Sequence, residues 1–310
     1  MKKQIGMIGL GKMGAAAALN LVDHGWDVYG YNRTSAVTHD LETQGVKGVY
    51  NLKEFADKLQ SPRVIFILVP ADGAVDQMIE GVLPHLSAGD FVIDAGNSNY
   101  KETIRRGKEI EEGKSGVHFF DVGFSGGPAG ARGGGCLMVG GRRAWYDQLK
   151  QLFVDLSVKD GEMFFEGIGA GHFVKMVHNG IEYGMMQAIA EGFDVMHRSE
   201  YKLNLLDVAK IYNHGSVVES RLTKWLEKAY IEQGIDLDAI SGAAGQGGGG
   251  AGQVQTKGEA VWTVEAARDL DAEVLVIDES IKAREKSRDN PNYQGKVINA
   301  LRNQFGGHKA

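Results

Sequence analysis

The first fourteen residues constrain the fold of this chain more than any other segment. An apolar run, residues 4–8, leads directly into the glycine-spaced residues 9–14, and an alanine-rich helical stretch follows. In a strand, turn and helix of this kind, Gly9 permits the tight turn, Gly11 lets a pyrophosphate approach the backbone, and Gly14 lets the helix pack closely on the strand. The helix N-terminus then offers free N–H groups to the phosphates. The pattern predicts a dinucleotide-binding turn made of Gly9, Leu10, Gly11, Met13 and Gly14.

The first half of the chain alternates short apolar runs with helical stretches. The predicted strands are residues 4–8, 27–31, 64–69, 91–94 and 118–122. The predicted helices start near Lys12, Ser35, Leu52, Ala74, Tyr100 and Arg143. Apolar strands separated by helices indicate a parallel sheet that is covered on both faces. We therefore expect an α/β fold whose N-terminal domain, residues 1–168, is doubly wound and Rossmann-type.

The pattern changes to helical periodicity beyond this domain. Gly167, Gly169 and Gly171 mark the boundary, and the helix-forming run that follows them ends near His197. Residues 241–252 are dense in glycine, which predicts a loop. We expect residues 169–310 to form a second, mostly α-helical domain.

Composition and charge exclude several classes of protein. The net charge of −6 disfavours nonspecific nucleic-acid binding. The longest apolar stretch, residues 64–69, is far shorter than the roughly 20 residues needed to cross a bilayer, and no cleavable signal region follows Lys3. Cys136 is the single cysteine, and no His, Cys and Asp cluster has metal-ligand spacing. We expect a cytoplasmic protein that binds no nucleic acid, membrane or metal.

The end of the second predicted strand bears on the choice of cofactor. NAD enzymes usually place a carboxylate there to bind the adenosine ribose, whereas this chain has Asn32, Arg33 and Thr34. Asn32 can bond a ribose oxygen or a phosphate, Arg33 can pair with a 2′-phosphate or stack on adenine, and Thr34 adds a hydroxyl. The triplet indicates NADP, with NAD also possible, since Arg33 can equally be a solvated loop residue.

Two glycine-rich polar motifs follow later strands. Residues 94–99 include Asn97, and residues 123–132 include Ser125 followed by two glycines. Both motifs lie at the carboxyl ends of predicted strands, where open α/β sheets bind ligands. The glycines expose backbone donors for an oxyanion, and Asn97 and Ser125 add side-chain donors. The alternative interpretation is a pair of polar turns.

A third polar group lies early in the predicted long helix. At about 100° per residue, Lys175, Asn179 and Glu182 share one face, which His178 and Tyr183 flank. Lys175 and Glu182 are about 10 Å apart along the helix axis, which is too far for a helix-surface ion pair. At this spacing they can flank a substrate several carbons long, with one residue taking a proton and the other giving one. The alternative is a solvated helix face with a structural histidine.

Together these motifs resemble the decarboxylating 6-phosphogluconate dehydrogenases. The resemblance is carried by residues 9–14, 32–34, 94–99, 125–127 and 169–183, and by a C-terminal tail, residues 302–308. The segment from Lys175 to Tyr183 is its most specific part. The chain is shorter than the common long form of these enzymes, and it resembles the short-form branch.

The resemblance implies oxidative decarboxylation of 6-phosphogluconate to ribulose 5-phosphate and CO2, a step of the pentose phosphate pathway. Lys175 would be the general base for the C3 hydroxyl and then an acid during loss of CO2, and Glu182 would protonate C1 of the enediol. The implied substrate-binding residues are Asn97, Ser125, Gly126, Gly127, His178 and Asn179, with Tyr183, Arg284, Arg302 and His308 around the phosphate. The nicotinamide side of the cofactor site would consist of Val69, Pro70, Ala71 and Asn97.

The resemblance also implies a homo-oligomer, either a dimer or a dimer of dimers, in which the helical domain binds substrate and mediates dimerisation. The C-terminal tail would complete the phosphate pocket of a neighbouring chain.

Two positions depart from the family pattern. Val261 stands where long-form enzymes have a lysine, so one phosphate contact is missing or is supplied by another residue, such as Lys257. Pro128 replaces an acidic residue that is common after the Ser-Gly-Gly motif.

Two other functions are compatible with parts of the sequence. Non-decarboxylating 3-hydroxyacid dehydrogenases of the 3-hydroxyisobutyrate dehydrogenase type share the glycine turn, the Ser-Gly-Gly motif and the helix lysine, but they lack the Glu182-Tyr183 pair and the C-terminal tail. A nucleotide-sensing module without catalysis is disfavoured because Lys175 and Glu182 are both present.

Overall fold

The computed structural model describes residues 2–71, 73–113, 116–244 and 258–306. The chain divides into two compact units, Met1–Met176 and Val177–Ala310, which we call the N-terminal and C-terminal units. The division falls inside a long helix, whereas the predicted domain boundary at residues 168 and 169 falls just before that helix begins.

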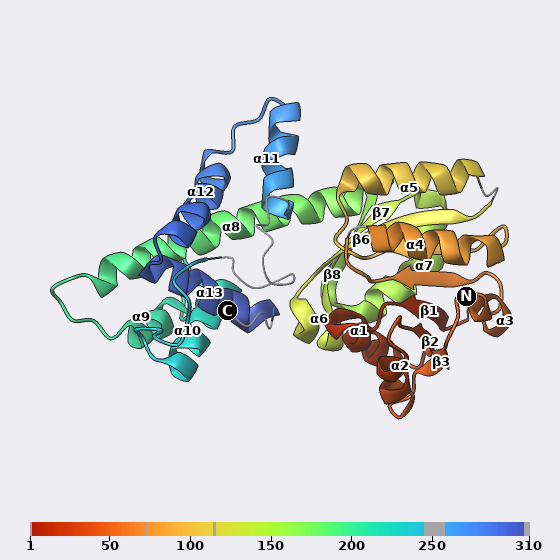
Figure 1. Cartoon of the computed structure of the whole chain (residues 1–310), viewed down its shortest axis with the longest axis horizontal. Helices are drawn as coiled ribbons and strands as arrows, with labels where there is room; N and C mark the ends of the chain where they lie inside the picture. Colours follow the sequence, from red (N-terminus) through yellow and green to blue (C-terminus); the bar gives the residue numbers. More distant parts are fainter. Residues whose placement is uncertain (1, 72, 114–115, 245–257, 307–310) are drawn as a thin grey trace. The chain divides into compact units, whose positions relative to one another are not determined.

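The N-terminal unit is built on one eight-stranded sheet (Figure 1). Its strands are β1 (Gln4–Ile8), β2 (Asp27–Tyr31), β3 (Lys47–Val49), β4 (Val64–Ile67), β5 (Phe91–Asp94), β6 (His118–Ser125), β7 (Gly135–Gly141) and β8 (Ser157–Glu166). Their order is β3-β2-β1-β4-β5-β6-β7-β8. Strands β1 to β6 are mutually parallel, β7 is antiparallel to β6, and β8 is parallel to β7. The strand order reverses between β1 and β4, which is where open sheets of this kind bind ligands.

Helices cover both faces of this sheet (Figure 1). They are α1 (Lys12–Asp23), α2 (Ser35–Glu42), α3 (Glu54–Lys58), α4 (Gly73–Val82), α5 (Tyr100–Gly113), α6 (Gly127–Gly133) and α7 (Arg143–Leu156), with a 3₁₀ turn at Leu83–His85. Apolar side chains of α1, α2 and α7 join one core cluster, and those of α3, α4 and α5 join another. β1, β4 and β5 are buried along their whole length, as a doubly wound sheet requires.

The structure confirms the doubly wound α/β architecture and corrects several boundaries. β4 ends at Ile67 rather than at Val69, because its partner strands β1 and β5 end opposite it, at Ile8 and Asp94. β6 continues beyond Val122 to Ser125, because β7 pairs with it as far as Cys136.

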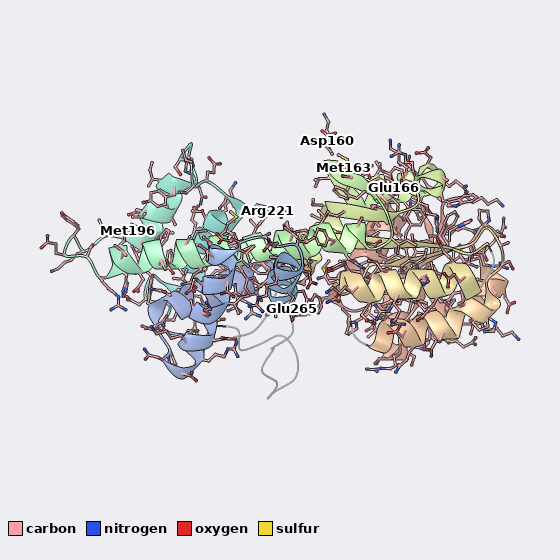
Figure 2. The ribbon with its side chains drawn as sticks, turned by 90° about the horizontal axis from the view of Figure 1, so that it is seen from above. Asp160, Met163, Glu166, Met196, Arg221 and Glu265 are labelled. Carbon is pink, nitrogen blue, oxygen red and sulfur yellow. The ribbon has the colours of Figure 1, made fainter. Side chains whose placement is uncertain are left out.

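Four elements of the N-terminal unit, β3, α6, β7 and β8, were not predicted from the sequence. β3 has only three residues, and β7 and α6 are rich in glycine, which disfavours both strands and helices. β8 is half-exposed at the edge of the sheet, where Asp160, Met163 and Glu166 lie along it (Figure 2). These elements form through their neighbours in the sheet rather than through local propensity.

The C-terminal unit is helical, which confirms that prediction. The helices are α8 (Ala170–His197), α9 (Leu205–Tyr212), α10 (Arg221–Gln233), α11 (Glu259–Asp269), α12 (Leu275–Asp289) and α13 (Tyr293–Gly306). α8 begins in the N-terminal unit and continues through the C-terminal unit, where α9, α10 and α13 contribute most of an apolar core around it. Most of the predicted loop at residues 241–252 lies outside the described residues. None of the helices that the structure describes is long and apolar enough to span a membrane.

Candidate active site

The turn after β1 has the backbone that a dinucleotide requires. Gly9 has φ +94°, and a Cβ there would lie 2.7 Å from Val69 Cγ1. A Cβ on Gly14 would overlap the carbonyl oxygen of Gly9. Around Gly11 the described residues place no heavy atom within 4 Å of such a Cβ, and its φ is −66°. Gly9 and Gly14 are therefore required by the fold, whereas Gly11 leaves space for a ligand.

This difference makes a matched pair of substitutions informative. We expect Gly11→Ala to keep Tm within about 2 °C of wild type and to weaken NADP binding at least about tenfold, because the methyl group occupies ligand space only. Gly14→Ala should instead lower the free energy of unfolding by about 1–3 kcal/mol, because its methyl group overlaps backbone. Thermal unfolding and fluorescence titration with NADPH measure both effects. Equal loss of Tm in the two variants would contradict the assignment of Gly11.

A cavity of about 660 Å³ opens at the carboxyl ends of β1, β2 and β4. Of the residues predicted to bind cofactor, it is lined by Gly9, Gly11, Asn32, Arg33, Thr34, Val69 and Pro70. Its volume and its polar rim over apolar walls suit a dinucleotide. The turn, the cavity and the adjacent helix N-terminus therefore fit an NAD(P) cofactor.

Five predicted cofactor residues do not line this cavity: Leu10, Met13, Gly14, Ala71 and Asn97. The N–H of Leu10 donates to Asn32 Oδ1 at 3.0 Å, and Met13 packs against the apolar core. The sequence analysis missed the wall formed by Gly73, Ala74, Gln77 and Met78 of α4. These residues carry no motif, and only the sheet order brings α4 to the cavity.

In the polar triplet after β2, Asn32 is held by hydrogen bonds and Arg33 is exposed at the cavity. Asn32 braces the glycine turn through Leu10, and its Nδ2 donates to the carbonyl of Thr34 at 3.2 Å. Arg33 is exposed at the cavity and forms no ion pair with any described carboxylate. α2 begins two residues later, at Ser35, so its positive N-terminal end lies beside the triplet.

The turn after β5 presents Asn97 in a left-handed conformation, with φ +56°. The fully buried Asp94 holds this turn on both sides of Asn97. Its Oδ1 accepts from the N–H of Gly96 at 3.0 Å, and its Oδ2 accepts from the hydroxyl of Ser98 at 2.7 Å. Asn97 itself is exposed. The buried carboxylate of Asp94 therefore holds the backbone of this turn in place, while the side chain of Asn97 remains open to a ligand.

One face of β6 carries three residues in alternation, Asp121, Gly123 and Ser125. The carboxylate of Asp121 accepts from the N–H groups of Gly169 and His172, both at 2.7 Å, and so caps the start of α8. Burial raises the pKa of Asp121, and His172 and the two N–H donors oppose that shift.

The capped helix places Lys175 against the same face of β6. A Cβ on Gly123 would overlap Lys175 Cβ and lie 2.9 Å from its Cγ, so glycine is what lets the lysine stem approach the strand. Lys175 is only 6% exposed. Since Ser125 follows Gly123 by two residues on this face, Lys175 and the Ser-Gly-Gly motif are neighbours within the N-terminal unit.

The cap of α8 continues into a buried polar chain. His172 Nδ1 lies 2.8 Å from the hydroxyl of Thr103, which in turn donates to the carbonyl of Asn99 at 3.2 Å. The sequence analysis singled out neither Asp121, His172 nor Thr103. The available signal was the position of Asp121, two residues before Gly123 on a predicted strand.

The Ser-Gly-Gly motif joins β6 to α6. Ser125 is the last residue of β6, and Gly126 and Gly127 follow with φ +125° and +62°. Pro128 lies in the first turn of α6, where no intrahelical partner exists for a backbone N–H. The departure at Pro128 is therefore compatible with a regular helix start.

In the C-terminal unit, a polar chain surrounds Glu182. Asn179 Nδ2 donates to the carboxylate of Glu259 on α11, so Asn179 Oδ1 faces His178 Nδ1 at 2.8 Å and accepts from it. The same His178 nitrogen is 3.9 Å from Glu182 Oε2. α11 approaches α8 closely because Gly180 has no side chain, and a Cβ there would lie 2.8 Å from Thr263 Cγ2. The sequence analysis did not identify Glu259, because it belongs to no recognised motif and only the fold brings it to Asn179.

Arg284 of α12 is a buried cation beside Tyr183. Its guanidinium carbon lies 3.3 Å from the centre of the Tyr183 ring. None of the described ion pairs involves it, and the nearby charge of Glu182 opposes the lowering of its pKa. Burial, and secondarily the neighbouring Arg302, lower the pKa of Arg284 to about 10, which still leaves it charged near neutral pH. Burial also lowers the pKa of Arg302. An anion bound here would compensate two desolvated positive charges.

Three residues of the predicted phosphate site, Tyr183, Arg284 and Arg302, therefore lie in one neighbourhood of the C-terminal unit. His308 and Lys257 lie outside the described residues. Val261 is half-buried on α11 and supplies no charge.

A doubly wound sheet with this glycine turn and cavity, followed by a helical unit, defines an NAD(P)-binding oxidoreductase of two domains. Residues 4–165 match the family described as the NAD binding domain of 6-phosphogluconate dehydrogenase, and residues 171–200 match 6-phosphogluconate dehydrogenase, C-terminal domain. The chain belongs to the 6-phosphogluconate dehydrogenase family.

Curated relatives of two lengths match the chain. The NAD(+)-dependent, decarboxylating 6-phosphogluconate dehydrogenase of Haloferax volcanii is 35% identical over 99% of this chain and 98% of its own. The NADP(+)-dependent, decarboxylating enzyme of Bacillus subtilis is 38% identical over 91% of this chain, which spans 61% of that longer relative.

Two solved structures show how the fold is shared. Plasmodium falciparum 6-phosphogluconate dehydrogenase, solved with NADP+ and with 6-phosphogluconate, is 31% identical, with a TM-score of 0.80 over 92% of this chain and 62% of its own. The 3-hydroxyisobutyrate dehydrogenase of Salmonella typhimurium is 18% identical, with a TM-score of 0.72 over 95% of this chain and 98% of its own, a likeness of fold alone.

Proposed function

We propose that this protein oxidises and decarboxylates 6-phosphogluconate to ribulose 5-phosphate and CO2, with NADP as its preferred hydride acceptor. The observation that carries the proposal is the buried Arg284 beside Tyr183. A desolvated arginine that takes part in no described ion pair favours an anionic ligand, and its ring partner Tyr183 directly follows the proposed proton donor Glu182. A non-phosphorylated 3-hydroxyacid offers only its carboxylate, whereas 6-phosphogluconate carries a phosphate in addition to its carboxylate.

Lys175 performs the first proton transfer. Its amine takes the proton of the C3 hydroxyl as the hydride leaves C3. NAD(P) bound in the cavity would supply the hydride acceptor. The resulting ammonium then stabilises the oxygen at C3 as the bond between C1 and C2 breaks and CO2 leaves. Its stem packs on Gly123, which holds the amine beside Ser125, the residue proposed to bind the sugar acid.

Glu182 performs the proton transfer to carbon. During loss of CO2 the Lys175 ammonium gives its proton to the C3 oxygen, which leaves an enediol. Glu182 then gives a proton to the carbon that becomes C1 of ribulose 5-phosphate, and the hydroxyl proton returns to the Lys175 amine as the new carbonyl forms. Asn179, oriented by Glu259, accepts from His178 Nδ1 and so fixes which nitrogen of that ring carries the proton. His178 and Asn179 are thereby oriented to bond the substrate hydroxyls.

The preference for NADP rests on Arg33. We expect wild type to have the higher kcat/KM with NADP, and Arg33→Ala to reduce the NADP to NAD ratio by about ten- to hundredfold, because one charge-assisted bond to the 2′-phosphate is lost. Steady-state kinetics with each cofactor measure the ratio. Arg198→Ala, which removes an exposed arginine of the C-terminal unit, is the control and should leave it unchanged. A wild-type preference for NAD would contradict the proposed contact between Arg33 and the 2′-phosphate, and Arg33 would then be a solvated loop residue without a role in binding.

One assay tests the function itself. Purified protein is incubated with 6-phosphogluconate and either NADP or NAD, and reduced cofactor and CO2 are measured together. The proposal requires both products in equal amounts. Reduced cofactor without CO2, or turnover of 3-hydroxyisobutyrate alone, would identify the non-decarboxylating alternative.

We also propose a cytoplasmic homodimer in which the C-terminal tail completes the phosphate pocket of the neighbouring chain. The proposal rests on the resemblance of residues 302–308 to the substrate-binding tail of the family. Arg302, at the start of that tail, lies near Tyr183 and Glu182 of its own chain, so the contribution to the neighbouring chain is assigned to the tail beyond it. A single cysteine, Cys136, agrees with a reducing compartment.

A further inference from the structure

Arg106 of α5 is a buried arginine that belongs to none of the motifs described above. Its side chain is 4% exposed. Nε and Nη2 donate to the two carboxylate oxygens of Asp76 on α4, at 3.0 and 2.7 Å. Nη1 points the other way, toward Ser98 Oγ at 3.2 Å and Asp94 Oδ2 at 3.5 Å. One guanidinium therefore joins a helix to the turn after β5.

All three partners of Arg106, which are Asp76, Asp94 and Ser98, adjoin the proposed site. Asp94 and Ser98 hold the turn on either side of Asn97, whose φ of +56° is unfavourable for a residue with a side chain. Asp76 immediately precedes Gln77 in α4, and Gln77 lines the cofactor cavity. Arg106 thus connects the wall of the cofactor cavity with the residue proposed to meet both cofactor and substrate.

Stability alone accounts poorly for this arrangement. Desolvating a guanidinium and two carboxylates offsets much of their attraction, so buried ion pairs contribute geometry more than stability. The neighbouring Arg105 already ties α5 to Asp76, with its side chain 41% exposed, and it also pairs with Glu102 and Glu109. Arg106 binds the same carboxylate, Asp76, and what it adds to the contacts of Arg105 is its bonds to Asp94 and Ser98.

We propose that Arg106 is a positioning residue, which sets the turn that presents Asn97 and transmits cofactor binding at α4 to that turn. Cofactor binding orders α4, α4 orders Arg106 through Asp76, and Arg106 holds the turn in its substrate-binding form. The role of Arg106 depends on the proposed function only in that 6-phosphogluconate is taken as the substrate.

The test compares Arg106→Met, Arg106→Lys and the matched control Arg105→Met. For Arg106→Met we expect KM for 6-phosphogluconate to rise at least about tenfold, while the Kd of NADP without substrate changes less than about threefold. The ratio of the substrate Kd without NADP to the substrate Kd with NADP should fall toward one. Arg106→Lys should recover part of the loss, and Arg105→Met should leave KM within about twofold. Equal effects of the two methionine variants, or parallel losses of NADP and substrate affinity, would overturn the proposal.

Two measurements keep the proposal testable if Arg106→Met fails to fold or if 6-phosphogluconate is not the substrate. Ser98→Ala removes the two hydrogen bonds of the Ser98 hydroxyl, to Asp94 Oδ2 and from Arg106 Nη1, and leaves the ion pair between Arg106 and Asp94 in place. We expect it to raise KM by about three- to fivefold with Tm nearly unchanged. A crystal structure of Ser98→Ala or Arg106→Lys reports the turn without any assay. An unchanged Asn97 backbone together with an unchanged KM would refute the positioning role, whereas a wild-type enzyme inactive on 6-phosphogluconate would refute only the proposed function.

Discussion

Lys175→Met is expected to lower kcat by about three to four orders of magnitude while 6-phosphogluconate still binds with nearly wild-type affinity. Methionine keeps the length and the apolar stem that lies on Gly123, so the buried position remains filled. It cannot exchange a proton, and both the oxidation and the loss of CO2 depend on that exchange. Steady-state kinetics and calorimetric titration with 6-phosphogluconate separate turnover from binding.

Lys108→Met is the control for this variant, because Lys108 is 70% exposed on α5, and kcat should stay within about twofold of wild type. The role assigned to Lys175 would be refuted if its variant lost substrate binding but retained turnover at saturation.

The same variant tests the shared active site. Lys175→Met and His308→Ala, a substitution in the tail beyond Arg302, are each expected to lose most activity, and co-expression should restore part of it, because a mixed dimer would have one site with both residues intact. Verified mixed dimers without recovered activity would assign the C-terminal tail to its own chain or to no site.

Glu182→Gln is expected to slow overall turnover by about a hundredfold and to slow hydride transfer much less. Glutamine preserves the shape of Glu182 and a polar contact toward His178, but it has no proton to give to the enediol. Single-turnover absorbance of the reduced cofactor reports oxidation, and the appearance of ribulose 5-phosphate reports the final protonation. The two signals should separate in time in the variant and coincide in wild type.

Glu265→Gln is the matched control, since Glu265 is an exposed carboxylate of α11 (Figure 2) and its replacement should alter neither signal. Equal slowing of both signals by Glu182→Gln would place this residue at or before hydride transfer instead.

Features set by neighbouring residues were predictable from the sequence. The glycine turn after β1 depends on spacing within six residues, and the structure confirms the strand and the helix on either side of it. The doubly wound class followed from apolar strands alternating with helices, and α8 followed from an unbroken helix-forming run. The position of the cavity at the carboxyl ends of β1, β2 and β4 also followed from strand direction alone.

Features that depend on contacts between distant segments were decided by the tertiary structure alone. Strand order brings α4 to the cofactor cavity, and the antiparallel β7 extends β6 to Ser125. Asp121 caps a helix that begins 49 residues later in the chain, and Arg106 reaches Asp76 30 residues earlier. Local propensity and spacing carry no information about such pairs. Their geometry arises because the sheet aligns strand ends at one edge and because glycines at positions such as Gly123 let helices approach the strands closely enough for side chains to meet.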